Sequence, residues 1–306
     1  MNTIFFIIVV FVIIFIYLSR NNKEGYENNT KPEKNNTEPK ENNTEPKENN
    51  TEEINKYDFL EIVKDSNRIY NQHKYKNKPL TELINKYNSH LMCKDLRIPT
   101  PELYYHGNFN DIKKNIFNKK AFVINPIQEC NSNNVFTLIN KNNKFINLFD
   151  GKDVKQEELY NVFKNKKVIV EEFIKNDDGE YTIPDDYKIF CFKGEIEFIL
   201  HRTVINNKYY SNCYDKDWKS MDIKVNNLPK GKLQPRPRKY LQMLEYCRII
   251  AGKVFPDVFV RLDFYFNNTD PVFGRITPTP NNGEELNDKK THDFLNYLCK
   301  KNDLSL

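Results

Sequence analysis

The sequence lacks the glycine-rich motifs through which the most common nucleotide-binding folds hold phosphate. Its 306 residues include only nine glycines, and these form neither GxGxxG nor GxxxxGK[ST]. The first motif opens a Rossmann dinucleotide site and the second is the P-loop, so neither phosphate cradle is expected. The GxSxG turn that presents a catalytic serine in α/β-hydrolases is absent as well.

The sequence also lacks a disulfide pattern and a metal-ligand pattern. Its six cysteines lie far apart without a CxxC pair, and its five histidines show no metal-ligand spacing. In a chain of this length, such cysteines are expected to be buried or free thiols. Neither a disulfide scaffold nor a zinc site is therefore expected.

Charged side chains are missing from residues 1–18, which are rich in Ile, Phe and Val. This run is close to the lower limit of roughly 17–25 residues for a spanning helix. It has neither the basic start nor the cleavage site of a secretory signal, so we predict a single-pass membrane anchor over residues 1–20. Arg20 and Lys23 follow the anchor, which favours a cytoplasmic position for the rest of the chain. Four Asn-x-Thr glycosylation acceptors would matter only in a secretory lumen: they begin at Asn28, Asn35, Asn42 and Asn49.

Residues 21–56 repeat a seven-residue unit close to NNTEPKE and have almost no apolar side chains. Without apolar surface to bury, this segment is expected to be a disordered linker. Residues 57–306 have the composition of a folded domain, with 40 basic and 33 acidic residues. Because the lysines alternate with acids rather than forming a stripe, nucleic acid is not an expected partner.

Hydrophobic periodicity predicts both helices and strands in residues 57–306, which indicates a mixed α/β fold of the α+β class. One apolar stripe marks the helix at 238–255: Leu241, Leu244, Cys247, Ile250 and Ala251. The other helices are expected at 57–73, 79–96 and 291–301. Strands are expected at 120–127, 134–140 and 167–174, and hairpins at 186–203 and 260–277.

The hairpin at 260–277 carries charged residues on alternating positions. Arg261 and Asp263 share one face of its first strand, and Arg275 and Thr277 share one face of its second strand. Asp263 lies among apolar residues, where an unpaired carboxylate would be costly to bury. It therefore needs a cation, and the candidates are Arg261, Arg275 or a metal ion.

Two further positions are candidates for a binding site. Glu171 and Glu172 end a predicted strand and must point to opposite faces, so only one of them can serve a given site. Lys188 lies on a strand rich in aromatic residues, where it either contacts a phosphate or extends to solvent.

The string IPDDYKIFCFKGEIEFILHRT (183–203), followed by YDKDW (214–218), resembles the TupA-like branch of the ATP-grasp family. That branch is associated with bacterial cell-wall and capsular polysaccharide biosynthesis. The resemblance covers roughly residues 75–295 and includes the VRLDFY strand at 260–265. The best-matched positions in its centre are Asp186, Lys188, Arg202, Tyr214, Asp215 and Trp218.

The resemblance implies an ATP-grasp fold of two α+β lobes that clamp ATP, with magnesium as the second cofactor. It implies that Glu171 and Glu172 contact the adenine, and that Lys188 contacts the phosphates. It further implies that Asp263 is a magnesium ligand. The catalytic set would then be Lys188, Arg202 and Arg261.

Two positions depart from the family pattern. Asn125 stands where the family has a phosphate-contacting lysine, and the loop after it has no glycine. Arg275 stands where the family has a glutamate that bridges the metal ions. We therefore expect an Arg275–Asp263 ion pair and a membrane-anchored relative of carboxylate–amine ligases with impaired catalysis. An active ligase that modifies a glycan or peptide, and a non-enzymatic surface protein of a membrane or virion, are the alternatives.

Overall fold

The structure is a computed structural model, and it describes residues 56–127, 134–141, 144–176, 181–205, 208–225, 227–267, 269–280 and 288–306. The chain divides into two units, Met1–Glu52 and Glu53–Leu306, and all described residues belong to the second. The anchor expected at 1–20 lies outside the described residues, as does the linker expected at 21–56 except for Lys56. Within the described part of the chain, no helix is long and apolar enough to cross a membrane.

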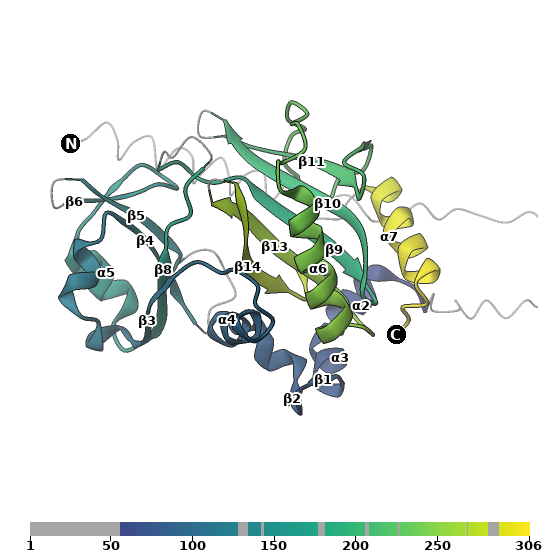
Figure 1. The fold of residues 1–306 in the computed structure, drawn as a ribbon, viewed down its shortest axis with the longest axis horizontal. Coiled ribbons are helices and arrows are strands. Elements are labelled where there is room, and N and C mark those ends of the chain that lie inside the picture. Colours follow the sequence, from purple (N-terminus) through teal and green to yellow (C-terminus); the bar gives the residue numbers. More distant parts are fainter. Residues whose placement is uncertain are drawn as a thin grey trace, which may run out of the picture. The chain divides into compact units, whose positions relative to one another are not determined.

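The described residues form helices, short 3-10 turns and strands (Figure 1). The helices are α2 Phe59–Lys64, α3 Ser66–Gln72, α4 Lys86–Asp95, α5 Gln156–Phe163, α6 Tyr240–Val254 and α7 Lys289–Lys301. The 3-10 turns are η1 Leu80–Ile84, η2 Phe109–Asp111 and η3 Lys114–Asn118. A two-stranded ladder joins β1 Lys74–Tyr75 to β2 Lys78–Pro79.

A large antiparallel sheet has the strand order β12-β11-β10-β9-β13-β14. Its strands are β9 Asp186–Phe192, β10 Glu195–Ile205, β11 Lys208–Asp215, β12 Ser220–Met221, β13 Phe259–Asn267 and β14 Asp270–Thr277. The β9–β10 and β13–β14 hairpins confirm the two hairpins expected from the sequence. Gly194 occupies the first turn with a φ of 83°, a left-handed conformation that glycine adopts without strain.

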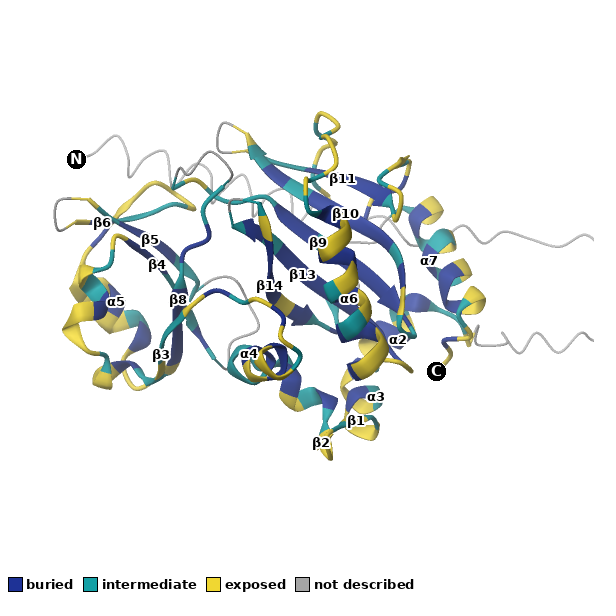
Figure 2. Cartoon of the chain, in the orientation of Figure 1, coloured by how far each residue is buried: buried dark blue, intermediate teal, exposed yellow. Residues whose placement is uncertain are grey.

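Helices cover both faces of the large sheet. Successive side chains of a strand point to opposite faces, and in β9 both sets are apolar. Ile189 and Cys191 point to one face and pack against α6, while Phe190 and Phe192 point to the other and pack with α2 and α7. Figure 2 shows the consequence: the strands are buried and the outward face of α6 is exposed. The sheet is therefore the middle layer of this part of the molecule.

The register of the α6 stripe differs from the sequence expectation at one residue. Leu241 was expected in the apolar stripe, but it is 63% exposed. The helix instead buries Tyr240 and Met243 together with Leu244 and the later stripe positions. The stripe is thus rotated by one residue at its N-terminal end, where the aromatic ring of Tyr240 provides the larger apolar surface.

A smaller antiparallel sheet has the order β3-β8-β4-β5-β6-β7. Its strands are β3 Leu103–Asn108, β4 Ala121–Pro126, β5 Phe136–Lys141, β6 Lys144–Asn147, β7 Asp153–Val154 and β8 Lys167–Glu172. Leu159 and Phe163 of α5 pack on one face of it, against Val168 and Val170. The mixed fold expected from the sequence is confirmed, and both sheets are antiparallel throughout.

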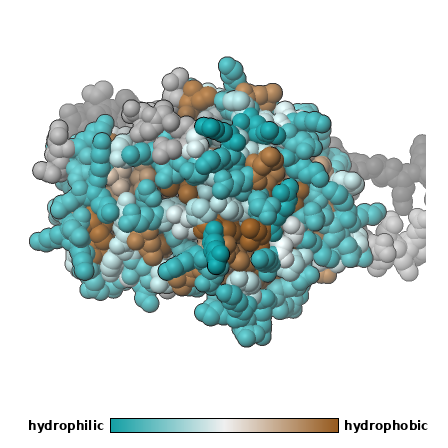
Figure 3. Space-filling view, in the orientation of Figure 1, coloured by the Kyte–Doolittle hydropathy of each residue, from teal (hydrophilic) through white to brown (hydrophobic). Residues whose placement is uncertain are grey.

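The surface in view is mostly hydrophilic, with separate apolar patches (Figure 3). The large apolar side chains exposed among the described residues come from many different elements. They are Leu91, Phe149, Tyr160, Ile205, Leu233, Leu241, Tyr297 and Leu306. Isolated exposures of this kind are normal for a folded protein and carry no function by themselves.

Candidate functional site

Four adjacent strands place six charged side chains on one face of the large sheet. Asp263 on β13 lies opposite Lys188 on β9 and opposite Arg275 on β14. Asp186 on β9 lies opposite Arg202 on β10. We call this set the charged cluster: Asp186, Lys188, Arg202, Arg261, Asp263 and Arg275.

Asp263 is the most tightly held member of the charged cluster. Arg261 binds it in a bidentate manner, with Nε donating to Oδ1 at 2.8 Å and a terminal nitrogen donating to Oδ2 at 3.0 Å. Lys188 Nζ donates to Oδ2 at 3.3 Å. Burial raises the pKa of the Asp263 carboxyl, but the charges of Arg261, Lys188 and Arg275 lower it well below its usual range.

Asp186 is the second carboxylate of the cluster and is also buried. Its Oδ2 lies 2.7 Å from Lys188 Nζ and accepts a hydrogen bond from Arg202 at 2.7 Å. Its Oδ1 is buried and receives no hydrogen bond from the described residues. A buried acceptor without a donor is costly, so this atom weakens the packing around Asp186.

The charged cluster carries a surplus of positive charge. It contains four basic side chains and two carboxylates, so its net charge is +2 when all six groups are ionised. Burial lowers the pKa of Lys188, although Asp186 and Asp263 act in the opposite direction. A partly buried surplus of this kind attracts an anion, and guanidinium groups match the geometry of phosphate and carboxylate.

The sequence expectation for Asp263 is corrected in one respect. The closest cations that hydrogen-bond to its carboxylate are Arg261 and Lys188. Arg275 is exposed, lies opposite Asp263 in the β13–β14 ladder, and lowers its pKa through its charge. Arg261 takes the role expected for Arg275 because two residues on one strand face are adjacent, and its planar guanidinium is long enough to bind both oxygens.

The donor set does not fit a magnesium ion. Magnesium requires oxygen ligands in near-octahedral geometry, and beside a bound phosphate it takes one or two of them from free protein carboxylate oxygens. Both oxygens of Asp263 and Oδ2 of Asp186 are already bonded to cationic side chains. Across the described ranges, no group of three His, Cys, Asp or Glu side chains could hold a metal ion. The expected role of Asp263 as a metal ligand is therefore not supported by the chemistry of its surroundings.

The two glutamates expected near the adenine lie on β8 of the smaller sheet. Glu171 is 1% exposed, and its carboxylate contacts Lys86 Nζ and lies 2.5 Å from His90 Nε2, both on α4. The side chain is therefore engaged within the protein, and the expected contact of Glu171 with adenine stays a prediction. Glu172 is partly exposed and accepts a hydrogen bond from the Glu102 amide at 3.2 Å.

The partners of Glu171 could be inferred only in part from the sequence. Lys86 and His90 are four residues apart and must share one face of a helix. Nothing in the sequence connects that face to residue 171, which is more than 80 positions away. The resemblance placed Glu171 at a ligand, whereas the structure shows a buried charged triad of Lys86, His90 and Glu171.

The remaining positions singled out by the resemblance are Asn125, which departs from the family pattern, and the matched residues Tyr214, Asp215 and Trp218. Asn125 is half-buried on β4, and residues 128–133 of the loop that follows it lie outside the described residues. Tyr214 and Trp218 stack with ring centroids 4.1 Å apart. The backbone carbonyl of Asp215 lies within 3.5 Å of the Tyr240 hydroxyl. These aromatic residues thus connect the end of β11 to α6 rather than joining the charged cluster.

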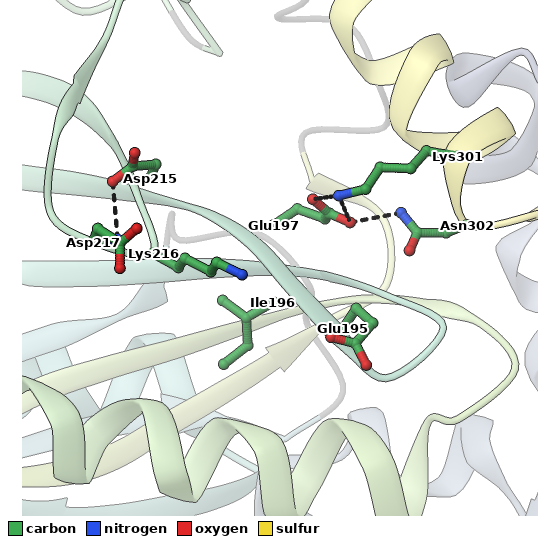
Figure 4. Close-up of a pocket in the computed structure, with 8 residues that line it drawn as sticks. All are labelled: Glu195, Ile196, Glu197, Asp215, Lys216, Asp217, Lys301 and Asn302. Atoms are coloured by element: carbon green, nitrogen blue, oxygen red, sulfur yellow. Dashed lines mark hydrogen bonds and ion pairs between the residues drawn. The ribbon is translucent and has the colours of Figure 1, made fainter.

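A small pocket lies where β10, β11 and the C-terminal end of α7 meet (Figure 4). Lys301 donates to both oxygens of Glu197, at 2.9 and 2.7 Å, and Asn302 donates at 2.8 Å. Asp215 accepts from the backbone amide of Asp217 at 2.9 Å. The pocket shares no residue with the charged cluster.

The described residues thus form two antiparallel sheets with flanking helices, and the larger sheet bears a face of lysine, arginine and aspartate. The family model described as TupA-like ATPgrasp matches residues 59–299. The chain therefore belongs to the TupA-like ATP-grasp family. The matched range is wider than the 75–295 expected from the sequence.

Several solved structures of ATP-grasp ligases resemble the chain. The ligase PsnB complexed with a minimal precursor has 8% identity and a TM-score of 0.43, with 72% of this chain and 61% of that chain covered. D-Alanine–D-alanine ligase from Helicobacter pylori has 18% identity and a TM-score of 0.41, with 70% and 57% covered. The enzyme of that name from Bacillus anthracis, complexed with ATP, has 15% identity and a TM-score of 0.41, with 64% and 56% covered. The chain thus spans about three fifths of the length of these proteins, and no curated protein matches it.

Proposed function

We propose that this protein binds the polyphosphate of a nucleotide such as ATP at the charged cluster, and that its ligase activity is lost or greatly weakened. The observation that carries the proposal is the composition of the cluster: three basic side chains pair with its two carboxylates, and a fourth, Arg275, lies opposite Asp263. Such a site supplies fixed positive charge to phosphate oxygens.

The proposed loss of activity rests on two substitutions. In the family pattern, magnesium ions bridge the phosphates and the protein carboxylates and neutralise their mutual repulsion. Here Arg275 stands at the position of the bridging glutamate, and a guanidinium repels a divalent cation. Asn125 stands at the position of a phosphate-contacting lysine. Phosphate would still be bound, but transfer of a phosphoryl group would lack its usual electrostatic support.

An active ligase that acts on a glycan or peptide is the second candidate function. It is favoured by the retained Lys188, Arg202, Arg261 and Asp263, which lie together on one face of the large sheet. Turnover of ATP by the purified protein at an ordinary enzyme rate, above about 1 per second, would support this candidate and contradict our proposal.

The nucleotide proposal is tested by thermal unfolding of the full chain with ATP, in the presence of EDTA or of magnesium. At a hundredfold excess over Kd, binding should stabilise the fold by about 2.7 kcal/mol, and we expect stabilisation in both conditions. The Lys188→Met variant should lose most of it, whereas Lys152→Met, at an exposed lysine elsewhere, should retain it. Stabilisation that requires magnesium in the wild type would contradict the proposal.

We also propose that residues 1–20 anchor the protein in a membrane, with the folded unit on the cytoplasmic side. The proposal rests on the uncharged run at 1–18 and on the basic residues that follow it. In cells that express the full chain, the protein should remain with the membrane fraction after alkaline carbonate extraction. Deletion of residues 1–18 should release it into the supernatant, and release of the wild type would contradict the anchor.

A further inference from the structure

Residues 229–239, which we call the basic segment, contain five basic residues and no acidic residue. The basic residues are Lys230, Lys232, Arg236, Arg238 and Lys239. Residues 113–120 hold four lysines without an acid as well, but the basic segment has the larger local surplus. The segment leads from the edge of the large sheet into α6.

The backbone of the basic segment is fixed to the large sheet although it is mostly irregular. Ser211 donates a backbone hydrogen bond to the Pro229 carbonyl at 3.0 Å, and the Asn212 side chain donates to the Lys232 carbonyl at 3.3 Å. The Trp218 indole donates to the Gln234 carbonyl at 3.0 Å. A rigid backbone of this kind lets the side chains bind a partner with a smaller loss of conformational entropy.

Gly231 explains how the basic segment approaches the sheet so closely. A Cβ atom at this position would lie 2.8 Å from Cβ of Tyr210, a contact that side chains do not tolerate. Prolines at 229, 235 and 237 restrict the backbone further, because each fixes its own φ. The segment is thus held as a preformed surface feature.

The side chains of the basic segment point outward. Lys230 forms an ion pair with Asp222, and Lys239 forms one with Asp270. For Lys232, Arg236 and Arg238, which are exposed, no carboxylate of the described residues lies within 4.0 Å. Two leucines accompany these cations: Leu233 is 55% exposed and Leu241 is 63% exposed.

We propose that the basic segment binds the anionic headgroups of a phospholipid bilayer. Exposed Lys and Arg side chains with interspersed leucines are the combination that binds the surface of an anionic membrane, since the cations pair with headgroups and the leucines enter the interface. Each basic residue close to such a surface strengthens binding about fivefold. The uncharged run at residues 1–18 favours a bilayer over other polyanions, because an anchored chain holds the segment near its target.

The test uses the full chain with a Cys130→Ser background and an environment-sensitive fluorophore on Leu233→Cys. The five described cysteines are buried, so the new thiol is the accessible one. Vesicles of phosphatidylcholine alone are compared with vesicles that contain 30% phosphatidylserine. The anchor is present in both titrations, so the label reports the contact of the basic segment itself.

We expect a blue shift of the label with the anionic vesicles only, and its loss when salt is raised from about 0.05 to 0.5 M. Reversing Lys232→Glu, Arg236→Glu and Arg238→Glu together should weaken this binding at least about tenfold. The matched control reverses the exposed Lys113→Glu, Lys114→Glu and Lys155→Glu and should leave it unchanged. An unchanged emission maximum of Trp218, the single tryptophan, shows that the segment of each variant is still docked.

Three results would overturn the proposal. Equal shifts with neutral and anionic vesicles would show that the headgroup charge is not recognised. Equal weakening by both sets of reversals would show a general effect of net charge. Binding of single-stranded RNA to the basic segment with higher affinity than the anionic vesicles, at the same salt concentration, would identify a nucleic acid as the partner instead.

Discussion

Replacing Asp263 with alanine should lower the free energy of unfolding by about 3–5 kcal/mol, because the substitution leaves buried cations without their counter-ion. Arg261 is 8% exposed and binds both oxygens of Asp263, and Lys188 binds one of them. Arginine cannot relieve the penalty by losing its proton. Urea denaturation followed by the fluorescence of Trp218 would measure the effect.

The control for this experiment is Asp222→Ala. Asp222 also pairs with two cations, Lys230 and Lys290, but all three side chains are exposed. Water replaces such contacts, so the denaturation midpoint should hardly change. A similarly small shift for Asp263→Ala would contradict the prediction. It would mean that water solvates Arg261 and Lys188 and that these cations do not need Asp263 as a counter-ion.

Replacing Glu171 with alanine should lower the free energy of unfolding by about 2–4 kcal/mol. The substitution removes the carboxylate that ties Lys86 and His90 of α4 to β8. Glu172→Ala on the same strand is the matched control, and it should cost about 1 kcal/mol or less because its side chain is partly exposed. Equal losses for the two variants would contradict the buried triad.

The same triad should make stability depend on acid pH. Burial raises the pKa of the Glu171 carboxyl, but the charges and hydrogen bonds of Lys86 and His90 lower it below its ordinary value. Because the folded pKa is lower than the unfolded value of about 4.3, the contribution is complete above that pH. It is lost as the pH falls through the folded pKa. Wild type should therefore lose stability more steeply below about pH 5 than Glu171→Gln.

The elements of the large sheet could be predicted because their signals are local. Alternation placed Arg261 with Asp263 and Arg275 with Thr277, and the β13–β14 register brings those two pairs together. The position of Asp263 among apolar residues correctly indicated a cationic partner, and one of the named candidates, Arg261, provides it. The alternating pattern could not decide which cation lies closest to Asp263, because that depends on side-chain length and on the neighbouring strand β9.

The contacts between distant elements could not be predicted. Glu171 meets Lys86 and His90 only after α4 packs near β8, and no periodicity encodes that pairing. The exposed position of Leu241 depends on Tyr240 packing under Trp218, whose ring centroid lies 5.1 Å away. The basic segment was not expected from the sequence, and the hydrogen bonds from Ser211, Asn212 and Trp218 show that it is fixed.

Isothermal titration calorimetry of ATP into the full chain tests the central proposal most directly. We propose that Arg275 and its neighbours replace the divalent cation, so the Kd measured in EDTA should equal the Kd in magnesium within about threefold. Arg275→Glu should then bind ATP at least about tenfold more weakly in EDTA, because a cation is exchanged for an anion beside the phosphates. Wild-type binding that is at least tenfold tighter with magnesium than in EDTA would contradict the account.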